Sequence, residues 1–193
     1  MKKQKAIPLK RFPLFIFLFL SFSVLAQEAA NTAGEQNSNE TETFKHHKPA
    51  IFTGYSWVPQ GRNENTGEKE TIFVPSIGFS YEYWFSEKWA IGTYNDVEIV
   101  KYEVERDDED IDLKRENALS LSLAAVYEVL PKWTLIAGGG LDIDKNETLP
   151  ILHLATEYVI LEKNATELSV SLSYNNKEYY DTFSIGLVLG KKL

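Results

Sequence analysis

From residue 50 onward, apolar and polar side chains alternate at every second position along most of the chain. Between residues 76 and 85, Ile77, Phe79 and Tyr81 fall on one parity, while serine, glycine and glutamate dominate the other. A period of two residues is typical of a β-strand whose two faces meet different surroundings. The pattern therefore predicts a sheet with one apolar face and one polar face.

The alternating stretches number eight, and short runs of turn-forming residues separate them. They span residues 50–58, 71–85, 88–105, 116–130, 132–144, 148–161, 166–174 and 179–191. Strands of soluble proteins usually have about five or six residues, and most of these stretches are much longer. Because a tilted strand needs about nine to eleven residues to cross a bilayer, the lengths favour the wall of a membrane barrel.

The sizes of the side chains on the two faces predict which face is outside. The polar face is mostly Ser, Gly, Ala and Thr, and the apolar face is mostly Leu, Ile, Phe and Tyr. Eight strands leave an interior barely wide enough for side chains, so the small residues are expected inside and the bulky ones against lipid. We predict an all-β fold: an eight-stranded antiparallel up-and-down transmembrane β-barrel over residues 50–193.

Aromatic residues and connection lengths agree with this interpretation. Aromatic side chains gather near both ends of the predicted strands, as in the two interfacial girdles of a membrane barrel; cross-strand pairing in a soluble sheet is the alternative. The long connections 59–70 and 106–115 fall at one end of the barrel, which we expect to be extracellular. Both chain termini are then expected on the periplasmic side.

The first 48 residues have a different composition. Five basic residues precede an apolar run that begins at Phe12, and Val24-Leu25-Ala26 places small residues where signal peptidase cleaves. We expect residues 1–26 to be a signal peptide, with an uncleaved membrane anchor as the alternative. Residues 27–48 are polar and small, which predicts a flexible N-terminal tail. The adjacent His46 and His47 in that tail are not expected to bind a metal.

The net charge of the chain limits the classes of partner that it is expected to bind. The net charge is −8, and the predicted mature chain has 15 basic against 28 acidic residues. An acidic protein is a poor match for nucleic acid. The chain contains no cysteine, so disulfides and thiolate metal sites are excluded. No motif predicts a cofactor, a metal site or a catalytic residue.

Three stretches of the sequence resemble segments of a known class of proteins. They are Val24–Gln27 at the end of the leader, Gly78–Gly92, and the closing Ile185–Gly190. Together with the alternation over residues 50–193, they resemble small outer-membrane β-barrel proteins of Gram-negative bacteria, of the porin-like and OmpA- or OmpX-like kind. The resemblance implies a location in the outer membrane, contact with its lipid, and insertion by the barrel-assembly machinery. Members typically end in an aromatic residue, whereas this sequence ends in Leu193.

The polar parity of the strands also carries ionisable side chains that are expected to face the lumen. They are Glu82, Asp96, Glu98, Glu128, Asp142, His153 and Glu157. No Lys or Arg falls clearly on that face, so the interior is predicted to be acidic. Three interpretations follow: a hydrated polar interior, a lumen that attracts cations, or a catalytic carboxylate–histidine site at His153.

The function predicted from these features is that of a non-enzymatic outer-membrane barrel. Such a protein would contribute to envelope structure, present surface loops, or pass small solutes or cations to a limited extent, and it is expected to be a monomer. Two alternatives remain open: an outer-membrane lipid-modifying enzyme centred on His153, and a secreted lipocalin-like binder with a soluble barrel.

Overall fold

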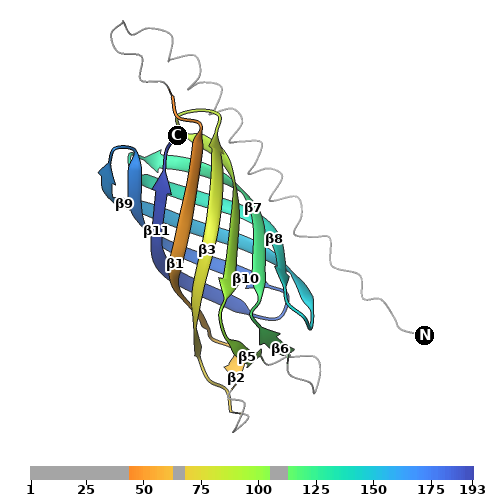
Figure 1. Ribbon diagram of the computed structural model, residues 1–193. Coiled ribbons are helices and arrows are strands. Elements are labelled where there is room, and N and C mark those ends of the chain that lie inside the picture. The colour runs from red at the N-terminus through yellow and green to blue at the C-terminus, as the bar shows by residue number, and fades with distance from the viewer. Residues whose placement is uncertain (1–43, 63–67, 105–112) are drawn as a thin grey trace, which may run out of the picture. The chain divides into compact units, whose positions relative to one another are not determined.

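A computed structural model describes residues 44–62, 68–104 and 113–193 (Figure 1). The predicted signal peptide, residues 1–26, and residues 27–43 of the predicted tail lie outside the described residues. The described part of the chain contains no helix that is long and apolar enough to cross a membrane.

Eight antiparallel strands close into a barrel (Figure 1). They are β1 (His47–Val58), β3 (Ile72–Trp84), β4 (Trp89–Glu98), β7 (Leu119–Leu130), β8 (Trp133–Ile143), β9 (Thr148–Lys163), β10 (Thr166–Lys177) and β11 (Asp181–Lys191). Each strand pairs with the barrel strand next to it in the chain, and β1 closes the barrel by pairing with both β3 and β11. The predicted eight-stranded up-and-down barrel is therefore confirmed.

A small second sheet continues from one end of the barrel. It has the order β2 (Gly61–Arg62), β5 (Lys101–Val104) and β6 (Leu113–Glu116). The sequence predicted unbroken strands over 88–105 and 116–130, and this is wrong, because the β4–β7 hairpin is interrupted before it continues as β5 and β6. Asn117, with a φ of 50°, lies at the break. Its left-handed backbone cannot continue a strand, so the hairpin changes direction and forms a separate sheet.

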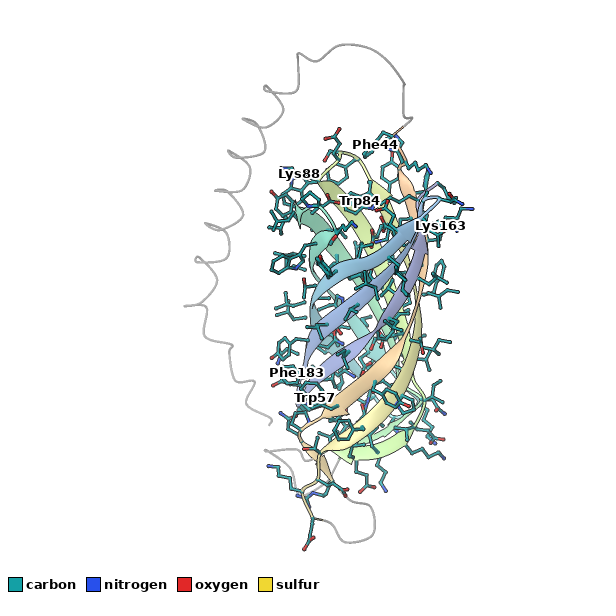
Figure 2. The ribbon with its side chains drawn as sticks, turned by 90° about the vertical axis from the view of Figure 1, so that its left-hand side faces the viewer. Phe44, Trp57, Trp84, Lys88, Lys163 and Phe183 are labelled. Carbon is teal, nitrogen blue, oxygen red and sulfur yellow. The ribbon has the colours of Figure 1, made fainter. Side chains whose placement is uncertain are left out.

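The two ends of the barrel differ. At one end, which we call the short-turn end, tight turns join β3 to β4, β7 to β8 and β9 to β10, and the chain closes with backbone hydrogen bonds between His47 and Leu193. At the other, the loop end, β1 leads to β3 through β2, and the β5–β6 hairpin projects. Figure 2 shows Phe44, Lys88 and Lys163 at the short-turn end and Trp57 and Phe183 at the loop end.

The first barrel strand starts earlier than the sequence predicted. β1 begins at His47, inside the segment 27–48 that was expected to be a tail, and Lys48 is buried. His46 and His47 make separate contacts: the ring of His46 bonds to the carbonyl oxygen of Trp84, and that of His47 to the hydroxyl of Tyr81. The barrel therefore includes the end of the predicted tail.

The bulky parity of every strand faces outward, as predicted. Leu123, Phe79 and Leu189 are 56%, 51% and 53% exposed, whereas Ser120 and Val126 on the opposite parity are buried. An apolar exterior of this extent requires a lipid surrounding. The Leu, Ile and Phe rows are therefore the lipid-facing surface of a transmembrane barrel.

Aromatic pairs mark both rims of this surface. Trp57 and Phe183, paired across β1 and β11, stack with ring centroids 5.1 Å apart at the loop end. At the short-turn end the rings of Trp89 and Tyr127 lie 4.5 Å apart across β4 and β7. The rim aromatics therefore also pair across strands, and they do so on the wall of a transmembrane barrel and not in a soluble sheet.

Candidate functional site: the ion-paired barrel interior

The seven ionisable residues predicted to face the lumen all lie on the inner parity of the barrel. Glu82, Glu98, Asp142, His153 and Glu157 are buried. Asp96 is half-buried and lines a cavity in the middle of the barrel, and Glu128 is half-buried at the short-turn mouth. They do not form one site, because two groups of ion pairs and a central cavity divide them.

The first group surrounds Lys48 near the short-turn end, and we call it the Lys48 cluster. The Nζ atom of Lys48 lies 3.5 Å from a carboxylate oxygen of Glu82, 3.7 Å from one of Glu157 and 3.6 Å from one of Glu167. All four side chains are almost completely buried. Lys192, at the mouth, makes a closer pair with Glu167 at 2.7 Å. Four strands, β1, β3, β9 and β10, thus contribute to the cluster, and Lys192 at its rim lies just beyond the end of β11.

Glu82 is the best satisfied carboxylate of the Lys48 cluster. The indole N–H of Trp84 donates to one of its oxygens at 2.9 Å, and the hydroxyl of Tyr94 donates to the other at 3.0 Å. Trp84 points inward and is buried, unlike Trp89 and Tyr127 at the same end. Its position follows from parity, because it shares the inner face of β3 with Glu82.

The second group lies toward the loop end and is centred on Asp142, and we call it the Asp142 cluster. Lys177 pairs with Asp142 at 3.1 Å and with Glu98 at 2.9 Å. Arg115, which comes from the small sheet, reaches Asp142 at 2.5 Å and Asp144 at 3.4 Å. The hydroxyl of Ser120 donates to the remaining oxygen of Asp142 at 2.7 Å. Each buried charge therefore has an opposite charge beside it, as burial requires.

A layer of apolar residues covers the Asp142 cluster at the loop end. Its members are Val58, Val74, Tyr102, Val104, Leu113, Leu149 and Tyr180. The hydroxyl of Tyr102 donates to Glu98, and that of Tyr180 lies 3.2 Å from the Nζ of Lys177. Burial raises the pKa of Tyr180 to about 12 and that of Tyr102 well above its usual value. Both phenols stay protonated at neutral pH, so the cap seals the loop end without adding charge.

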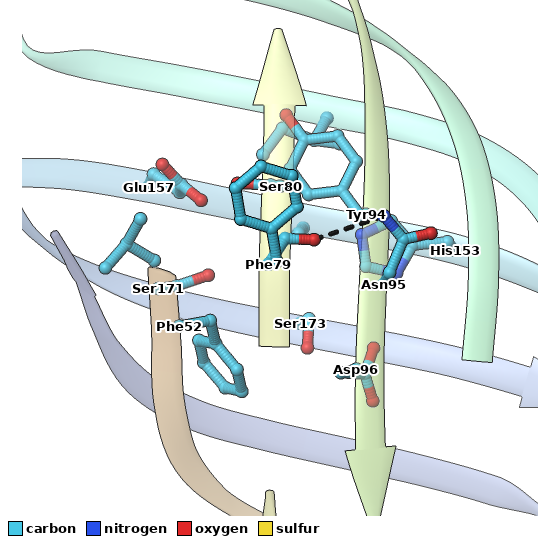
Figure 3. Close-up of a pocket in the computed structure, with 13 residues that line it drawn as sticks. Phe52, Phe79, Ser80, Tyr94, Asn95, Asp96, His153, Glu157, Ser171 and Ser173 are labelled. Atoms are coloured by element: carbon cyan, nitrogen blue, oxygen red, sulfur yellow. Dashed lines mark hydrogen bonds between the residues drawn. The ribbon is translucent and has the colours of Figure 1, made fainter. Parts of the chain in front are cut away.

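A small cavity of about 50 Å³ lies in the middle of the barrel, between the two groups (Figure 3). His153 lies beside it, with Nδ1 2.6 Å from the side-chain oxygen of Asn175 and with its ring stacked on Tyr94 at 5.5 Å. Figure 3 shows Glu157 and His153 at opposite sides of this cavity. No serine or carboxylate is hydrogen-bonded to His153 among the described residues, so the geometry lacks the nucleophile–base pair of the catalytic interpretation.

The expectation that no Lys or Arg faces the lumen is wrong. Lys48 and Lys177 are buried inside the barrel, and Arg115 is buried over its loop end. Each was assigned to a non-strand segment: Lys48 to the tail, Arg115 to a loop and Lys177 to a turn. A signal was present for two of them, since extending the predicted stretch 50–58 backward by two residues and the stretch 166–174 forward by three places Lys48 and Lys177 on the inner parity. Arg115 carried no such signal, because the break at Asn117 interrupts the parity.

The ion-paired interior offers no site for a polyvalent metal among the residues that the structure describes. No group of three or more His, Asp or Glu side chains there is arranged to hold a metal ion. Most of the buried carboxylates instead lie beside lysine, arginine or hydroxyl groups. The described interior is therefore a set of ion pairs between side chains of this chain, with small cavities between them.

Taken together, the closed barrel, the lipid-facing exterior and the ion-paired interior define a small transmembrane β-barrel protein. No family model matches the chain, and no curated protein matches it. The similar solved structures include Ail, the attachment invasion locus protein of Yersinia pestis, with 12% identity and a TM-score of 0.46 over 78% of this chain and 100% of that one. Neisserial surface protein A has 11% identity and a TM-score of 0.47 over 76% and 97% of the two chains. Outer Membrane Protein W of E. coli has 10% identity and a TM-score of 0.40 over 78% and 100%.

Proposed function

We propose that this chain is a non-enzymatic protein of the bacterial outer membrane, whose barrel is a closed anchor for the β2–β5–β6 sheet at the cell surface. The observation that carries the proposal is the blocked interior. The Lys48 cluster lies across the lumen inside the short-turn mouth, and the Asp142 cluster with its apolar cap lies across it near the loop end. A lumen closed in two places favours an anchoring role over solute passage.

The location in the outer membrane is supported by the exterior and by the leader. A lipid-facing band on a closed antiparallel barrel is the arrangement of outer-membrane proteins. A signal peptide over residues 1–26 would deliver the chain to the periplasm, where the barrel-assembly machinery would insert it as a monomer into outer-membrane lipid. The short turns and the first and last residues of the barrel chain then face the periplasm, and the small sheet faces outward.

Neither alternative function finds support in the arrangement of the side chains. A lipid-modifying enzyme needs its reactive groups at the lipid surface, whereas His153 is buried inside the wall. A lipocalin-like binder needs a polar exterior and an apolar interior, and this barrel has the reverse distribution. We therefore propose a role in the cell envelope without catalysis for this chain.

Location and orientation can be tested with single cysteines, because the natural chain has none. Lys114→Cys lies on the small sheet and Lys163→Cys on the short-turn rim, and both positions are exposed. In intact cells, a membrane-impermeant maleimide should label Lys114→Cys only, and permeabilised cells should show labelling of both. Labelling of Lys163→Cys alone in intact cells would reverse the orientation, and recovery of the protein in the soluble periplasmic fraction would remove the membrane assignment.

The closed lumen can be tested by electrical recording. The protein purified in detergent and inserted into a planar bilayer should show no steady conductance, with a general-diffusion porin as the positive control. Heat-modifiable gel migration of the same sample should establish that the inserted protein is folded. A steady ohmic current from folded protein would contradict the anchoring role and favour solute passage.

A further inference from the structure

The interior contains a carboxylate that its neighbours do not satisfy. Glu157 is 4% exposed, and its only ion-pair partner within 4 Å among the described residues is Lys48, at 3.7 Å. That distance exceeds a hydrogen bond, and Glu157 Oε2 has no hydrogen-bond partner. Glu82 and Glu167, the other carboxylates around Lys48, each have closer donors. An unsatisfied buried carboxylate oxygen is costly, so a missing partner is expected there.

Space for such a partner lies on both sides of Glu157. The residue lines the central cavity and also a larger space of about 200 Å³ that opens at the short-turn mouth. Lys192, Lys132 and Glu128 line the outer part of that space. A small ion could therefore reach Glu157 from the short-turn end, while the apolar cap closes the path at the loop end.

The charges around Lys48 indicate whether the missing partner of Glu157 is positively or negatively charged. The ion-paired group contains Lys48 and Lys192 against Glu82, Glu157 and Glu167. Two positive and three negative groups leave one net negative charge. One monovalent cation would balance it, whereas a divalent ion would leave an excess positive charge in a low-dielectric interior.

The neighbouring strands supply oxygen ligands. Thr134 on β8 and Ser171 on β10 are the direct register partners of Glu157 on β9, and both are buried on the inner face. Ser171 lines the central cavity and Thr134 lines the mouth space. Carboxylate, hydroxyl and water oxygens are the ligands of hard cations.

We propose that Glu157, flanked by Thr134 and Ser171, binds one monovalent metal cation, Na⁺ or K⁺, that enters the barrel from the short-turn end. The bound ion completes the charge balance of the Lys48 cluster and fastens β8, β9 and β10 together at that level. The site is open only toward the short-turn end, because the apolar cap closes the loop end, so the ion binds without crossing the membrane. It is independent of the anchoring role, which concerns the loop-end sheet.

The test compares unfolding in different salts. The mature chain in detergent is unfolded by urea in NaCl, KCl or choline chloride at equal ionic strength, because choline is too large for the site. Wild type should unfold at a higher urea concentration in NaCl or KCl, and sodium NMR should show line broadening by the folded protein. Glu157→Gln should weaken the apparent affinity about tenfold or more, since even partners one step removed from a bound ion contribute that much.

Matched variants keep the test decisive. Glu162→Gln, at an exposed carboxylate on the same strand and the same mouth, should keep the full cation effect. If Glu157→Gln does not fold, Ser171→Ala should still reduce the affinity, whereas Ser76→Ala, which alters a buried serine on β3, should not.

Two results would overturn the proposal. One is an identical urea midpoint of wild type in choline, sodium and potassium salts. The other is an infrared band of a protonated carboxyl group in wild type at neutral pH that disappears in Glu157→Gln, which would assign the missing positive charge to a proton.

Discussion

The Nζ of Lys177 on β10 lies 3.1 Å from a carboxylate oxygen of Asp142 on β8, across the intervening strand β9. Both side chains are fully buried. Replacing Lys177 by Met removes the positive charge but leaves Asp142 and Glu98 inside the barrel. We expect Lys177→Met to lower the free energy of unfolding by about 3–5 kcal/mol, because an uncompensated buried charge remains.

Urea unfolding of the refolded variant in detergent measures this loss. Lys163→Met at an exposed turn-end position is the control and should change stability little. Equal midpoints for Lys177→Met and wild type would show that the Asp142 cluster is hydrated and contributes little.

Two adjacent glycines on β8 should respond very differently to alanine. A Cβ at Gly140, which faces inward, would overlap the backbone carbonyl of Leu121 on β7. A Cβ at Gly139, which faces lipid, would meet only the carbonyl oxygen of Ile151, at 3.1 Å. Gly140→Ala should cost about 3 kcal/mol, because β7 and β8 must move apart, and Gly139→Ala should cost much less. The difference is measured as the shift in urea midpoint, and a larger loss for Gly139→Ala would contradict the register of β7 and β8.

The turn between β9 and β10 stores backbone strain at Ala165. Asn164 and Ala165 form the two-residue connection with φ angles of 51° and 61°. Asn tolerates this left-handed conformation, but for Ala it costs about 1–2 kcal/mol. Ala165→Gly should raise the free energy of unfolding by about 0.5–1 kcal/mol, part of the relief being offset by the greater freedom of unfolded glycine.

Asn164→Gly is the matched substitution for this turn. It should leave stability nearly unchanged, because asparagine already accepts the left-handed region. Thermal or urea unfolding compares the two variants, and destabilisation by Ala165→Gly would mean that the turn does not adopt this geometry.

Depth in the bilayer should control the effect of a charge on the outer face. Leu123 lies in the middle of β7 and is exposed, and Phe73 lies near the loop-end rim of β3. Leu123→Arg should cost about 2–4 kcal/mol, and Phe73→Arg about 0–1 kcal/mol, because only the former places the charge in hydrocarbon. Unfolding in lipid vesicles gives both values. Equal costs would argue against a membrane band centred on β7.

The small sheet should contribute a pH-dependent element. Glu116 pairs with Lys101 at 2.7 Å and also with Lys145. The hydrogen bond from Lys101, followed by that from Lys145, lowers the pKa of Glu116 below its ordinary value. A lowered pKa in the folded state means that the pair stabilises the sheet above the ordinary pKa of glutamate, about 4.3. That stabilisation is lost as the pH falls through the lower folded value.

An NMR titration of the Glu116 carboxyl carbon measures this pKa directly. Lys145→Met should move the midpoint upward, toward the ordinary value. A midpoint that does not change on this substitution would show that Lys145 does not pair with Glu116 in solution.

The sequence by itself determined the wall of this barrel. Alternation of apolar and polar residues identified eight strands, and the size difference between the Leu123 and Ser120 rows identified the lipid side. Those features are local, because the direction of each side chain along a strand follows from its parity alone. The inward positions of Glu82, Asp142 and Glu157 could be predicted for the same reason.

Only the tertiary structure decided what these carboxylates contact. Lys48, Lys177 and Arg115 lie at or beyond the ends of the regular alternation, in segments that sequence patterns assign to a tail, a turn and a loop. Barrel closure brings β1 beside β11, and the break at Asn117 directs Arg115 back over the lumen. Such contacts join residues that lie far apart in the chain, so the alternation along a single strand cannot predict them. The interior looks acidic in the sequence, but in the folded chain its carboxylates are paired with lysine and arginine side chains.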